Sequence, residues 1–465
     1  MAAADGLKRF VTKMEEAKCS SSAIAAFTAN YQQLTTAGTG MVGEASIESV
    51  ASLPHLSSLA PDTSSLADYL SRTAVLKLNG GLGTGMGLEK AKSLLPVKDG
   101  LTFLDLIAKQ VKHMRQSFSA DVRFILMNSF STSDDTKAHL AKEHGDLLAE
   151  PHIELMQNMS PKVLKETLEP AVWAADPSLE WCPPGHGDIY ASLAGSGMLD
   201  ELLAAGIEYV FVSNSDNLGA TLDPKLLCHF AEQKLPFVME VCERTEADKK
   251  GGHLARRKAD GGLLLREAAQ CAPEDEAAFQ DVSKHKFFNT NNLWVNLKAL
   301  KETMDANGGA LALPLIQNSK TVDPRDKSSP KVLQLETAMG AAIECFEGAS
   351  AVVVPRERFA PVKTCNDLLS LRSDAFSLTE DFRVVLAAPT PPVVKLDDAH
   401  YKLVDGLEAH VDGYPSLVGC SKLTVKGPVR FQAGAVVKGA VTVTNAGQEP
   451  KPWPAGTYED TTVEL

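Results

Sequence analysis

The sequence predicts an α/β protein, in which helices flank a central mixed, mostly parallel sheet, with a helical N-terminal piece and a C-terminal β-helix. Two observations lead to this prediction. In the middle of the chain, short apolar runs alternate with helical patterns, which indicates a mostly parallel sheet covered on both faces. Beyond about residue 390, apolar segments recur every five or six residues, as is typical of a β-solenoid. The length of 465 residues leaves room for roughly three domains.

Residues 1–70 are expected to form a helical N-terminal region. Weak helical periodicity appears around Leu7, Phe10 and Met14 and again around Ile24 and Phe27, in a segment rich in Ala and Ser. A stretch rich in Pro and Ser follows from 54 to 64. Such a composition is typical of a connector, so the main domain is expected to begin after it.

Residues 71–375 are expected to form a domain built on the parallel sheet. Each strand candidate is a short apolar run, and most are separated from the next by a longer helical pattern. Ligands of such sheets bind beyond the carboxyl ends of the strands. The expected strands are 74–78, 122–127, 209–212, 237–241 and 293–297, and the expected helices are 103–118, 134–143, 189–205 and 224–232.

Residues 376–465 are expected to form the solenoid. Short apolar segments such as 423–425 and 435–437 recur there, and Gly427, Gly434 and Gly439 separate them. Successive coils of a solenoid stack their apolar positions into one core. A few antiparallel hairpins are the alternative explanation of the same pattern.

Composition and charge limit the classes of function that the chain can have. Lys and Arg number 46 and Asp and Glu 59, so the net charge is −13, whereas nucleic-acid binding needs a broad basic surface. No apolar run is long enough for a membrane span, and the N-terminus lacks an apolar signal core. The eight cysteines are scattered without zinc-ribbon spacing, which fits a reducing compartment. We therefore expect a cytoplasmic protein that binds neither nucleic acid nor membrane.

The most informative segment is a glycine-rich loop directly after the first expected strand of the sheet, residues 78–87 with the sequence Leu-Asn-Gly-Gly-Leu-Gly-Thr-Gly-Met-Gly. Glycine tolerates positive φ, and consecutive glycine N–H groups can face a phosphate or a nucleobase with no Cβ in the way. The loop matches neither the dinucleotide fingerprint nor the P-loop. Lys90, Lys92 and Lys98 follow, and a lysine folded back over such a loop can clamp a phosphate. A tight turn without a ligand is the alternative.

The loop followed by Lys92 resembles the nucleotide-binding loop of eukaryotic UTP–glucose-1-phosphate uridylyltransferases, also called UDP-glucose pyrophosphorylases. The resemblance extends from about residue 70 to about residue 445, and the residue pattern is most similar to that of the kinetoplastid branch. It implies a Rossmann-like, GT-A-like nucleotidyltransferase sheet and a left-handed β-helix. It also implies UTP and glucose 1-phosphate as substrates, UDP-glucose and pyrophosphate as products, and Mg²⁺ as cofactor. Family members range from monomers to octamers joined through the C-terminal domain, so self-association there is left open.

Further segments match the family and have fitting chemistry. Gln157 offers a donor and an acceptor, which suits the imide edge of uracil. Asp216 ends a strand beside the loop, where a hard metal ion can bind, and many members have glycine where Ser215 stands. The segment 287–294 resembles the sugar-binding loop, in which amides suit sugar hydroxyls. The segment 356–364 resembles a second signature, whose lysine, Lys363 here, reaches the phosphates from the far side of the cleft.

The resemblance thereby assigns a role to each candidate residue. Catalysis falls to Lys92 and Lys363, and the metal to Asp216. Nucleotide binding falls to Leu78, Asn79, Gly80, Gly81, Gln157, Gly185, Ser215 and Asp216, and sugar-phosphate binding to Gly80, Gly81, His186, Asn214, Ser215, Asp216, Asn291 and Phe359.

The implied reaction is a direct, reversible, in-line attack of glucose 1-phosphate on the α-phosphate of UTP, assisted by Mg²⁺. The attacking oxygen is already charged, so positioning and cations are the expected catalytic devices rather than a general base. Two relatives within the fold are alternatives: a UDP-sugar pyrophosphorylase of broad specificity and a UDP-N-acetylhexosamine pyrophosphorylase. A non-catalytic nucleotide sensor or scaffold is the alternative from another class.

Overall fold

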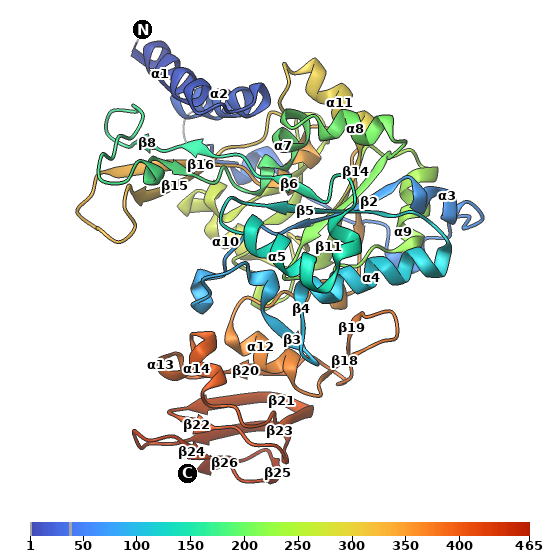
Figure 1. Ribbon diagram of the computed structural model, residues 1–465, viewed down its shortest axis with the longest axis vertical. Helices are drawn as coiled ribbons and strands as arrows, with labels where there is room; N and C mark the ends of the chain where they lie inside the picture. The colour runs from blue at the N-terminus through green and yellow to red at the C-terminus, as the bar shows by residue number, and fades with distance from the viewer. Residues whose placement is uncertain (1, 37–39) are drawn as a thin grey trace.

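The structure, a computed structural model, describes residues 2–36 and 40–465. Within these ranges, seven strands form the central sheet in the order β17-β11-β14-β10-β2-β5-β6. Strand β14 runs antiparallel to its neighbours β10 and β11, and the other pairs are parallel. The predicted mixed, mostly parallel sheet is therefore confirmed (Figure 1). The strands are β2 (Thr73–Leu78), β5 (Arg123–Asn128), β6 (Glu154–Met156), β10 (Tyr209–Asn214), β11 (Phe237–Glu243), β14 (Phe287–Asn296) and β17 (Ser350–Val353).

Helices cover both faces of this sheet because its strands are apolar on both sides. On β2, Val75 belongs to one buried cluster and Leu76 to another, as the alternation of side chains along a strand requires. The first cluster includes α3 (Leu66–Ser71), α4 (Phe103–Phe118), α5 (Ser133–Glu143), α6 (Gly145–Leu148) and α9 (Pro224–Glu232). The second includes α7 (Ile189–Gly195), α8 (Met198–Ala204) and α11 (Leu297–Ala306).

Two expected elements differ from the structure. The single helix expected over 189–205 is two helices, because Gly197 adopts a left-handed backbone with φ 81° and separates α7 from α8. The segment 287–294, expected as a loop, lies within β14, and a bulge opposite Glu240 and Val241 breaks its register. Alternating buried side chains make this segment a strand in spite of its many amides.

The N-terminal region packs against small sheets at one end of the molecule. Helices α1 (Ala2–Glu16) and α2 (Ser21–Thr36) bury Phe10, Met14 and Phe27 against a sheet of β8 (Val163–Leu164), β16 (Lys331–Glu336) and β15 (Ile316–Thr321). The region also supplies β1 (Ile47–Ser49), which pairs with β12 (His253–Arg257), itself paired with β13 (Leu263–Arg266). Smaller elements are β7 (Ser160–Pro161), β9 (Trp181–Cys182) and α10 (Glu276–Gln280).

The C-terminal region is a stack of parallel strands at the opposite end (Figure 1). In register, Leu423 pairs with Val441 and Val425 with Val443, so equivalent positions recur after one coil and bury their side chains together. Parallel pairing between these strands excludes antiparallel hairpins between them. The stack contains β20 (Val393–Lys395), β21 (Ser416–Lys426), β22 (Val429–Arg430), β23 (Ala435–Thr444), β24 (Lys451–Pro452), β25 (Gly456–Glu459) and β26 (Thr462–Glu464).

Short elements connect the stack to the central sheet. Helix α12 (Cys365–Arg372) contacts β20 and also β3 (Pro96–Lys98), which is paired with β4 (Leu101–Thr102). The hairpin of β18 (Phe376–Leu378) and β19 (Val384–Leu386) and the helices α13 (Asp398–Tyr401) and α14 (Val404–Glu408) complete the connection.

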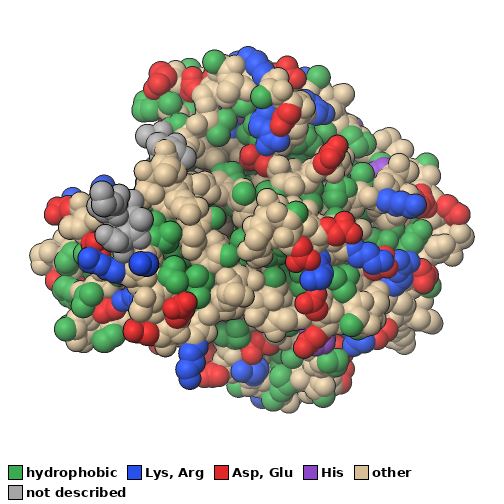
Figure 2. Space-filling model, turned by 90° about the horizontal axis from the view of Figure 1, so that it is seen from above, with side chains coloured by type: hydrophobic (Ala, Val, Ile, Leu, Met, Phe, Trp, Pro, Cys, Tyr) green, Lys and Arg blue, Asp and Glu red, His purple; other side chains and the backbone are tan. Residues whose placement is uncertain are grey.

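The surface and the helices that the structure describes can be compared with those of proteins that bind nucleic acid or cross a membrane. On the face shown in Figure 2, Lys and Arg side chains are interspersed with Asp and Glu. In the part of the chain that the structure describes, no helix combines the length and the apolar character that a bilayer crossing requires. All eight cysteines lie in the described ranges, and each is a free thiol.

Candidate active site

The glycine-rich loop is held against β5 by hydrogen bonds from its first residues. The backbone N–H of Asn79 donates to the Met127 carbonyl at 2.7 Å, and its side-chain amide donates to Asn128 Oδ1 at 2.7 Å. The Ser129 hydroxyl donates to the Gly80 carbonyl at 2.9 Å. These bonds fix the start of the loop at the carboxyl ends of β2 and β5, where ligands of parallel sheets bind.

Lys92 returns over the loop, as the sequence predicts. Its backbone N–H donates to the Gly81 carbonyl at 3.0 Å, which anchors the turn that begins with Lys92. Gly83 has φ 71°, and a Cβ there would come within 3.1 Å of Lys92 Cγ. The lysine stem therefore lies directly on this glycine, and a side chain at position 83 would displace it.

Lys92 reaches Asp216, which follows β10. The Lys92 Nζ lies 2.7 Å from Asp216 Oδ2, and the two side chains are only 15% and 24% exposed. Ser215 fixes the backbone beside them, since its N–H and its hydroxyl both donate to the Leu78 carbonyl, at 3.2 and 2.8 Å. The Asp216 carboxylate therefore holds a cation, the Lys92 ammonium, beside the loop.

Gln157, Gly185 and His186 form the opposite wall. The Gln157 amide donates to the Gly185 carbonyl at 3.2 Å. Gly185 has φ 82°, and a Cβ there would lie 2.5 Å from the Thr337 carbonyl oxygen, so only glycine fits. The Met339 N–H donates to His186 Nδ1 at 3.0 Å, and burial lowers the His186 pKa to about 4. At neutral pH the ring is therefore neutral and carries its proton on Nε2.

Asp188 clamps this wall to the strand end that carries Gln157. Its carboxylate accepts hydrogen bonds from the Asn158 backbone N–H at 2.7 Å, the Asn158 amide at 3.0 Å and the Ser192 hydroxyl at 2.7 Å. Burial raises the pKa of Asp188. Asp188 also precedes α7 as its N-cap residue, but its carboxylate makes no capping hydrogen bond.

These walls enclose one pocket of about 380 Å³. It is lined by Leu78, Asn79, Gly80, Gly81, Lys92, Ser93, Met127, Gln157, Pro183, Gly185, His186, Asn214, Ser215 and Asp216. Eleven of the fourteen candidate residues are among them, and the other three, Asn291, Phe359 and Lys363, lie elsewhere.

Phe359 and Lys363 line a second, larger cleft of about 1390 Å³, together with residues near the hairpin β18–β19. Both belong to residues 354–363, hereafter the strap, which follows β17. The Lys363 side chain is exposed, but the neighbouring Val362 N–H donates to the Asp216 carbonyl at 3.1 Å. The strap therefore touches the pocket through its backbone, while the Lys363 ammonium lies outside the pocket lining.

Asn291 lies at the bulge of β14 and has φ 59°. Its side-chain oxygen accepts a hydrogen bond from the Asn289 amide at 2.8 Å. Leu293, two residues later, pairs with Val212 of β10. Because β10 ends at Asn214, just beyond Val212, and Asp216 follows it, the bulge lies beside the same strand end as the pocket.

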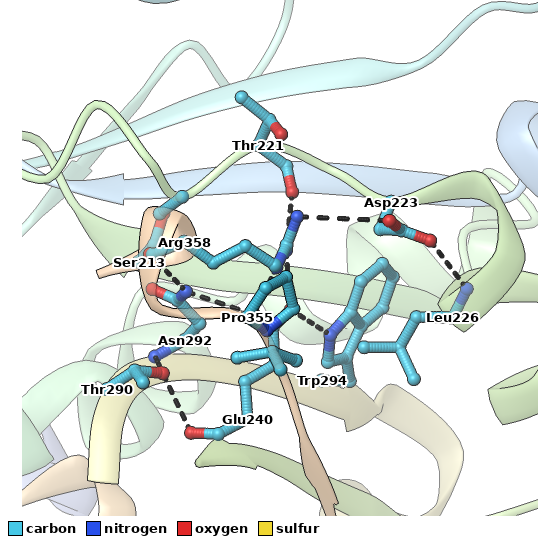
Figure 3. A network of polar contacts seen from close by, with 12 residues as sticks. Ser213, Thr221, Asp223, Leu226, Glu240, Thr290, Asn292, Trp294, Pro355 and Arg358 are labelled. Carbon is cyan, nitrogen blue, oxygen red and sulfur yellow. Dashed lines mark hydrogen bonds and ion pairs between the residues drawn. The ribbon is translucent and has the colours of Figure 1, made fainter. Parts of the chain in front are cut away.

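A buried ion pair anchors the strap, and sequence reasoning missed it (Figure 3). Arg358 donates to both oxygens of Glu240 at 2.7 Å, and the Trp294 indole and the Asn292 amide each donate to the same carboxylate at 3.0 Å. The Glu240 side chain is wholly buried. The Arg358 carbonyl also accepts from the Asn217 amide at 3.1 Å, one residue after Asp216.

Lys77 is a second charged residue that sequence reasoning missed. It precedes Leu78 on β2, is buried, and donates to the Ser213 hydroxyl and the Ala220 carbonyl, both at 2.6 Å. Burial lowers the Lys77 pKa to about 7. Lys77 therefore ties β2 to β10 and to the segment that follows it, one residue before Leu78 of the pocket lining.

The fold and the pocket together define the class of protein. A glycine loop at the carboxyl end of a parallel sheet, with a lysine over it and an aspartate beside it, is the arrangement of an α/β enzyme that binds a nucleotide.

Comparison with known sequences identifies the family more specifically. The family model for UTP–glucose-1-phosphate uridylyltransferase matches residues 24–438. The enzyme of that name from Saccharomyces cerevisiae is 44% identical over 377 residues, which cover 80% of this chain and 74% of the yeast protein.

Solved structures agree over nearly the whole chain. A mutant of UDP-glucose pyrophosphorylase from Leishmania major, in complex with UDP-glucose, is 51% identical with a TM-score of 0.92, and 99% of each chain is covered. A Trypanosoma brucei UDP-glucose phosphorylase is 49% identical with a TM-score of 0.87, over 99% of this chain and all of the other. The chain belongs to the UTP–glucose-1-phosphate uridylyltransferase family, and it is a nucleotidyltransferase that makes UDP-glucose.

Proposed function

We propose that the chain makes UDP-glucose by direct in-line attack of a glucose 1-phosphate oxygen on the α-phosphorus of UTP. The new P–O bond forms as the bond to the bridging oxygen breaks, and pyrophosphate leaves. The observation that supports this most is the contact between Lys92 and Asp216 over the glycine loop, because it brings a cation and a metal-binding oxygen to one nucleotide-sized pocket. The attacking oxygen is already charged, so no residue is required as a base.

The pocket suggests a role for each wall. Loop residues 78–81 and Gln157 hold the nucleotide, with the Gln157 carboxamide reading the uracil edge. His186 donates from Nε2 to a phosphate oxygen without adding charge of its own. Lys92 neutralises the triphosphate, and Asn214, Ser215 and Asp216 lie where the sugar phosphate meets it. Asn291, at the bulge beside the same strand end, contacts the sugar.

The residues present fit Mg²⁺. Asp216 supplies a hard carboxylate oxygen, and a cationic group already lies at 2.7 Å from it. Mg²⁺ is commonly held by one or two carboxylates together with substrate phosphates, so a single aspartate suffices when UTP is bound. When bound, the ion neutralises developing charge on the phosphate oxygens.

Lys363 completes the site by moving. Open and closed structures have been determined for the Leishmania major enzyme, which is 52% identical to this chain with a TM-score of 0.92. We propose a corresponding closure here, in which the strap brings Lys363 and Phe359 to the sugar phosphate. The hydrogen bond from Val362 to the Asp216 backbone supports a short path for this movement.

The remaining expectations are part of the same proposal. The parallel stack after residue 392 is a left-handed β-helix, through which copies of the chain can associate, and the chain divides into 1–70, 71–375 and 376–465. The free thiols support a reducing, cytoplasmic location.

A pyrophosphate-release assay tests the proposed substrate. The purified chain receives UTP and Mg²⁺ with glucose 1-phosphate, galactose 1-phosphate or N-acetylglucosamine 1-phosphate. We expect release with glucose 1-phosphate and at least about tenfold lower kcat/KM with the other two sugars. Equal rates with galactose 1-phosphate would indicate the broad-specificity relative, and preference for N-acetylglucosamine 1-phosphate would indicate the N-acetylhexosamine relative. No release with any sugar phosphate would support the non-catalytic sensor.

A further inference from the structure

A cluster of metal-ligating side chains lies outside both clefts. It consists of Asp105 in the first turn of α4, His139 in α5 and His144 at the junction of α5 and α6. One ligand atom from each lies within 4.8 Å of the other two. The three side chains line neither cleft, so the proposed reaction does not use them.

The carboxylate of this cluster is fixed by the N-terminal cap of α4. Asp105 Oδ2 accepts from the Thr102 backbone N–H at 2.9 Å and from its hydroxyl at 2.7 Å. Burial opposes ionisation, but these bonds and those from the histidines lower the pKa of Asp105 well below its ordinary value. Because Oδ2 is occupied by the cap, the other oxygen, Oδ1, faces the two imidazoles in a fixed orientation.

Both imidazoles present the same nitrogen to that oxygen. His139 Nε2 lies 2.8 Å and His144 Nε2 2.9 Å from Asp105 Oδ1. Ligand atoms around a tetrahedral Zn²⁺ are about 3.3 Å apart, given bonds of about 2.0–2.1 Å. To coordinate one ion, each Nε2 would move about half an ångström away from Oδ1, its ring proton would reside on Nδ1, and the two Nε2 atoms, now within 4.8 Å of each other, would also have to lie about 3.3 Å apart.

We propose that Asp105, His139 and His144 form a binding site for a divalent transition metal, of which Zn²⁺ fits best. Imidazole nitrogen and carboxylate oxygen are ligands that Zn²⁺ prefers, and two imidazoles disfavour Mg²⁺ and Ca²⁺. The His139 side chain is 19% exposed, which gives an ion a path from solvent and a water its fourth position.

The site would act on structure rather than on chemistry. Thr136, one turn before His139 on α5, accepts a hydrogen bond from the Asn79 amide of the glycine loop at 3.0 Å. A bound ion would join α4 to α5 one turn from this contact and on the same face of α5, since residues three apart on a helix are neighbours. The alternative is that Asp105 only accepts hydrogen bonds from two histidines and joins the helices without a metal.

A metal-binding experiment decides between these alternatives. It uses the full chain without a polyhistidine tag, after treatment with a chelator. Zn²⁺ is titrated in competition with a chromophoric chelator, and Co²⁺ is added separately so that visible spectra identify the ligands. The variants are His139→Gln and His144→Gln, in which the amide can still donate to Asp105 but binds metal poorly. The control is His113→Gln, a partly exposed histidine on α4 outside the cluster.

We expect one Zn²⁺ per chain in the native protein and in His113→Gln, and at least about tenfold weaker binding in each cluster variant. Co²⁺ spectra should show tetrahedral bands without thiolate charge transfer, which separates this site from the free cysteines. Zn²⁺ should raise the Tm of the native chain but not of His139→Gln; if His144→Gln fails to fold, His139→Gln alone decides. No bound Zn²⁺, equal affinity in native and His139→Gln proteins, or a thiolate spectrum would overturn the proposal.

Discussion

The glycine loop and the strap approach the same strand end, but the structure prepares them differently. The loop is bonded along its backbone to β5, and its lysine, Lys92, already lies against Asp216. The strap is anchored internally by Arg358, while its lysine, Lys363, points into the other cleft. In the proposed mechanism, Lys92 is therefore already in place, whereas Lys363 has to be brought to the pocket when substrates are bound.

The largest expected effect is on the anchor of the strap. Arg358→Met leaves Glu240 buried without its cation, so the free energy of unfolding should fall by about 3–5 kcal/mol. Urea unfolding measures it. Arg356→Met is the matched control, because Arg356 pairs with Asp248 at the surface and should cost at most about 1 kcal/mol. If both variants lose the same small amount, the strap has no buried anchor.

Substitutions of the two lysines should separate an effect on UTP binding from an effect on turnover. Lys92→Ala and Lys363→Ala should each lower kcat by at least about a hundredfold, since each removes a charge-stabilising donor. Only Lys92→Ala should also weaken UTP binding to the resting protein, because only Lys92 lies in the pocket beforehand. Isothermal titration with UTP and steady-state kinetics measure the two effects, with the exposed Lys90→Ala as control. Wild-type turnover in either variant would refute its role, and equal loss of UTP affinity would refute the contrast.

Asp216→Asn should raise the Mg²⁺ concentration needed for half-maximal activity by at least about tenfold, because an amide oxygen is a weaker ligand than a carboxylate. Binding of Mn²⁺ to the UTP complex, followed by electron paramagnetic resonance, gives a readout independent of turnover. Asp121→Asn, at the surface, is the control. An unchanged metal titration would show that Asp216 does not hold the ion.

Lys77 should make the free energy of unfolding depend on pH in the neutral to alkaline range. Its folded pKa of about 7 lies below the ordinary value of about 10.4, so between these values the unfolded chain binds a proton that the folded chain lacks. Stability should therefore rise with pH across this window, by up to about 1.4 kcal/mol per pH unit. Lys77→Met should flatten this rise relative to the native chain and to Lys90→Met in urea unfolding. Equal slopes in all three would mean that Lys77 stays charged when folded.

The smallest expected effect concerns the departure from the family at position 215. Ser215→Gly removes the hydroxyl bond to Leu78 but keeps the backbone bond, so stability should fall by about 0.5–1.5 kcal/mol. The value of kcat should stay within about threefold. Thermal unfolding and kinetics of the same preparation measure both effects. A loss of turnover comparable to that of Lys92→Ala would give the hydroxyl a catalytic part.

The fold and most of the pocket were predictable because they depend on local patterns. Short apolar runs locate the strands of a buried parallel sheet, and the glycines and Lys92 lie close together in sequence. The resemblance to a known family supplied the distant residues, such as Gln157 and His186, which line the same pocket.

The buried charges were not predictable, since a charged residue is ordinarily assumed to be exposed. Arg358 and Glu240 are 118 residues apart, and only the completed sheet brings them together. Lys77 lies within an apolar run, and its hydrogen-bond acceptors come from another strand and the segment that follows it. The position of Lys363 depends on how the strap lies across the sheet, which no local pattern records.

One apolar cluster runs unbroken from Val75 of the central sheet through Tyr401 to Val443 near the C-terminus. During synthesis, the ribosome exposes the catalytic half long before it releases the last coils that complete this cluster. A nascent chain that lacks these coils therefore has part of this cluster uncovered, and the cluster can be completed only after they emerge.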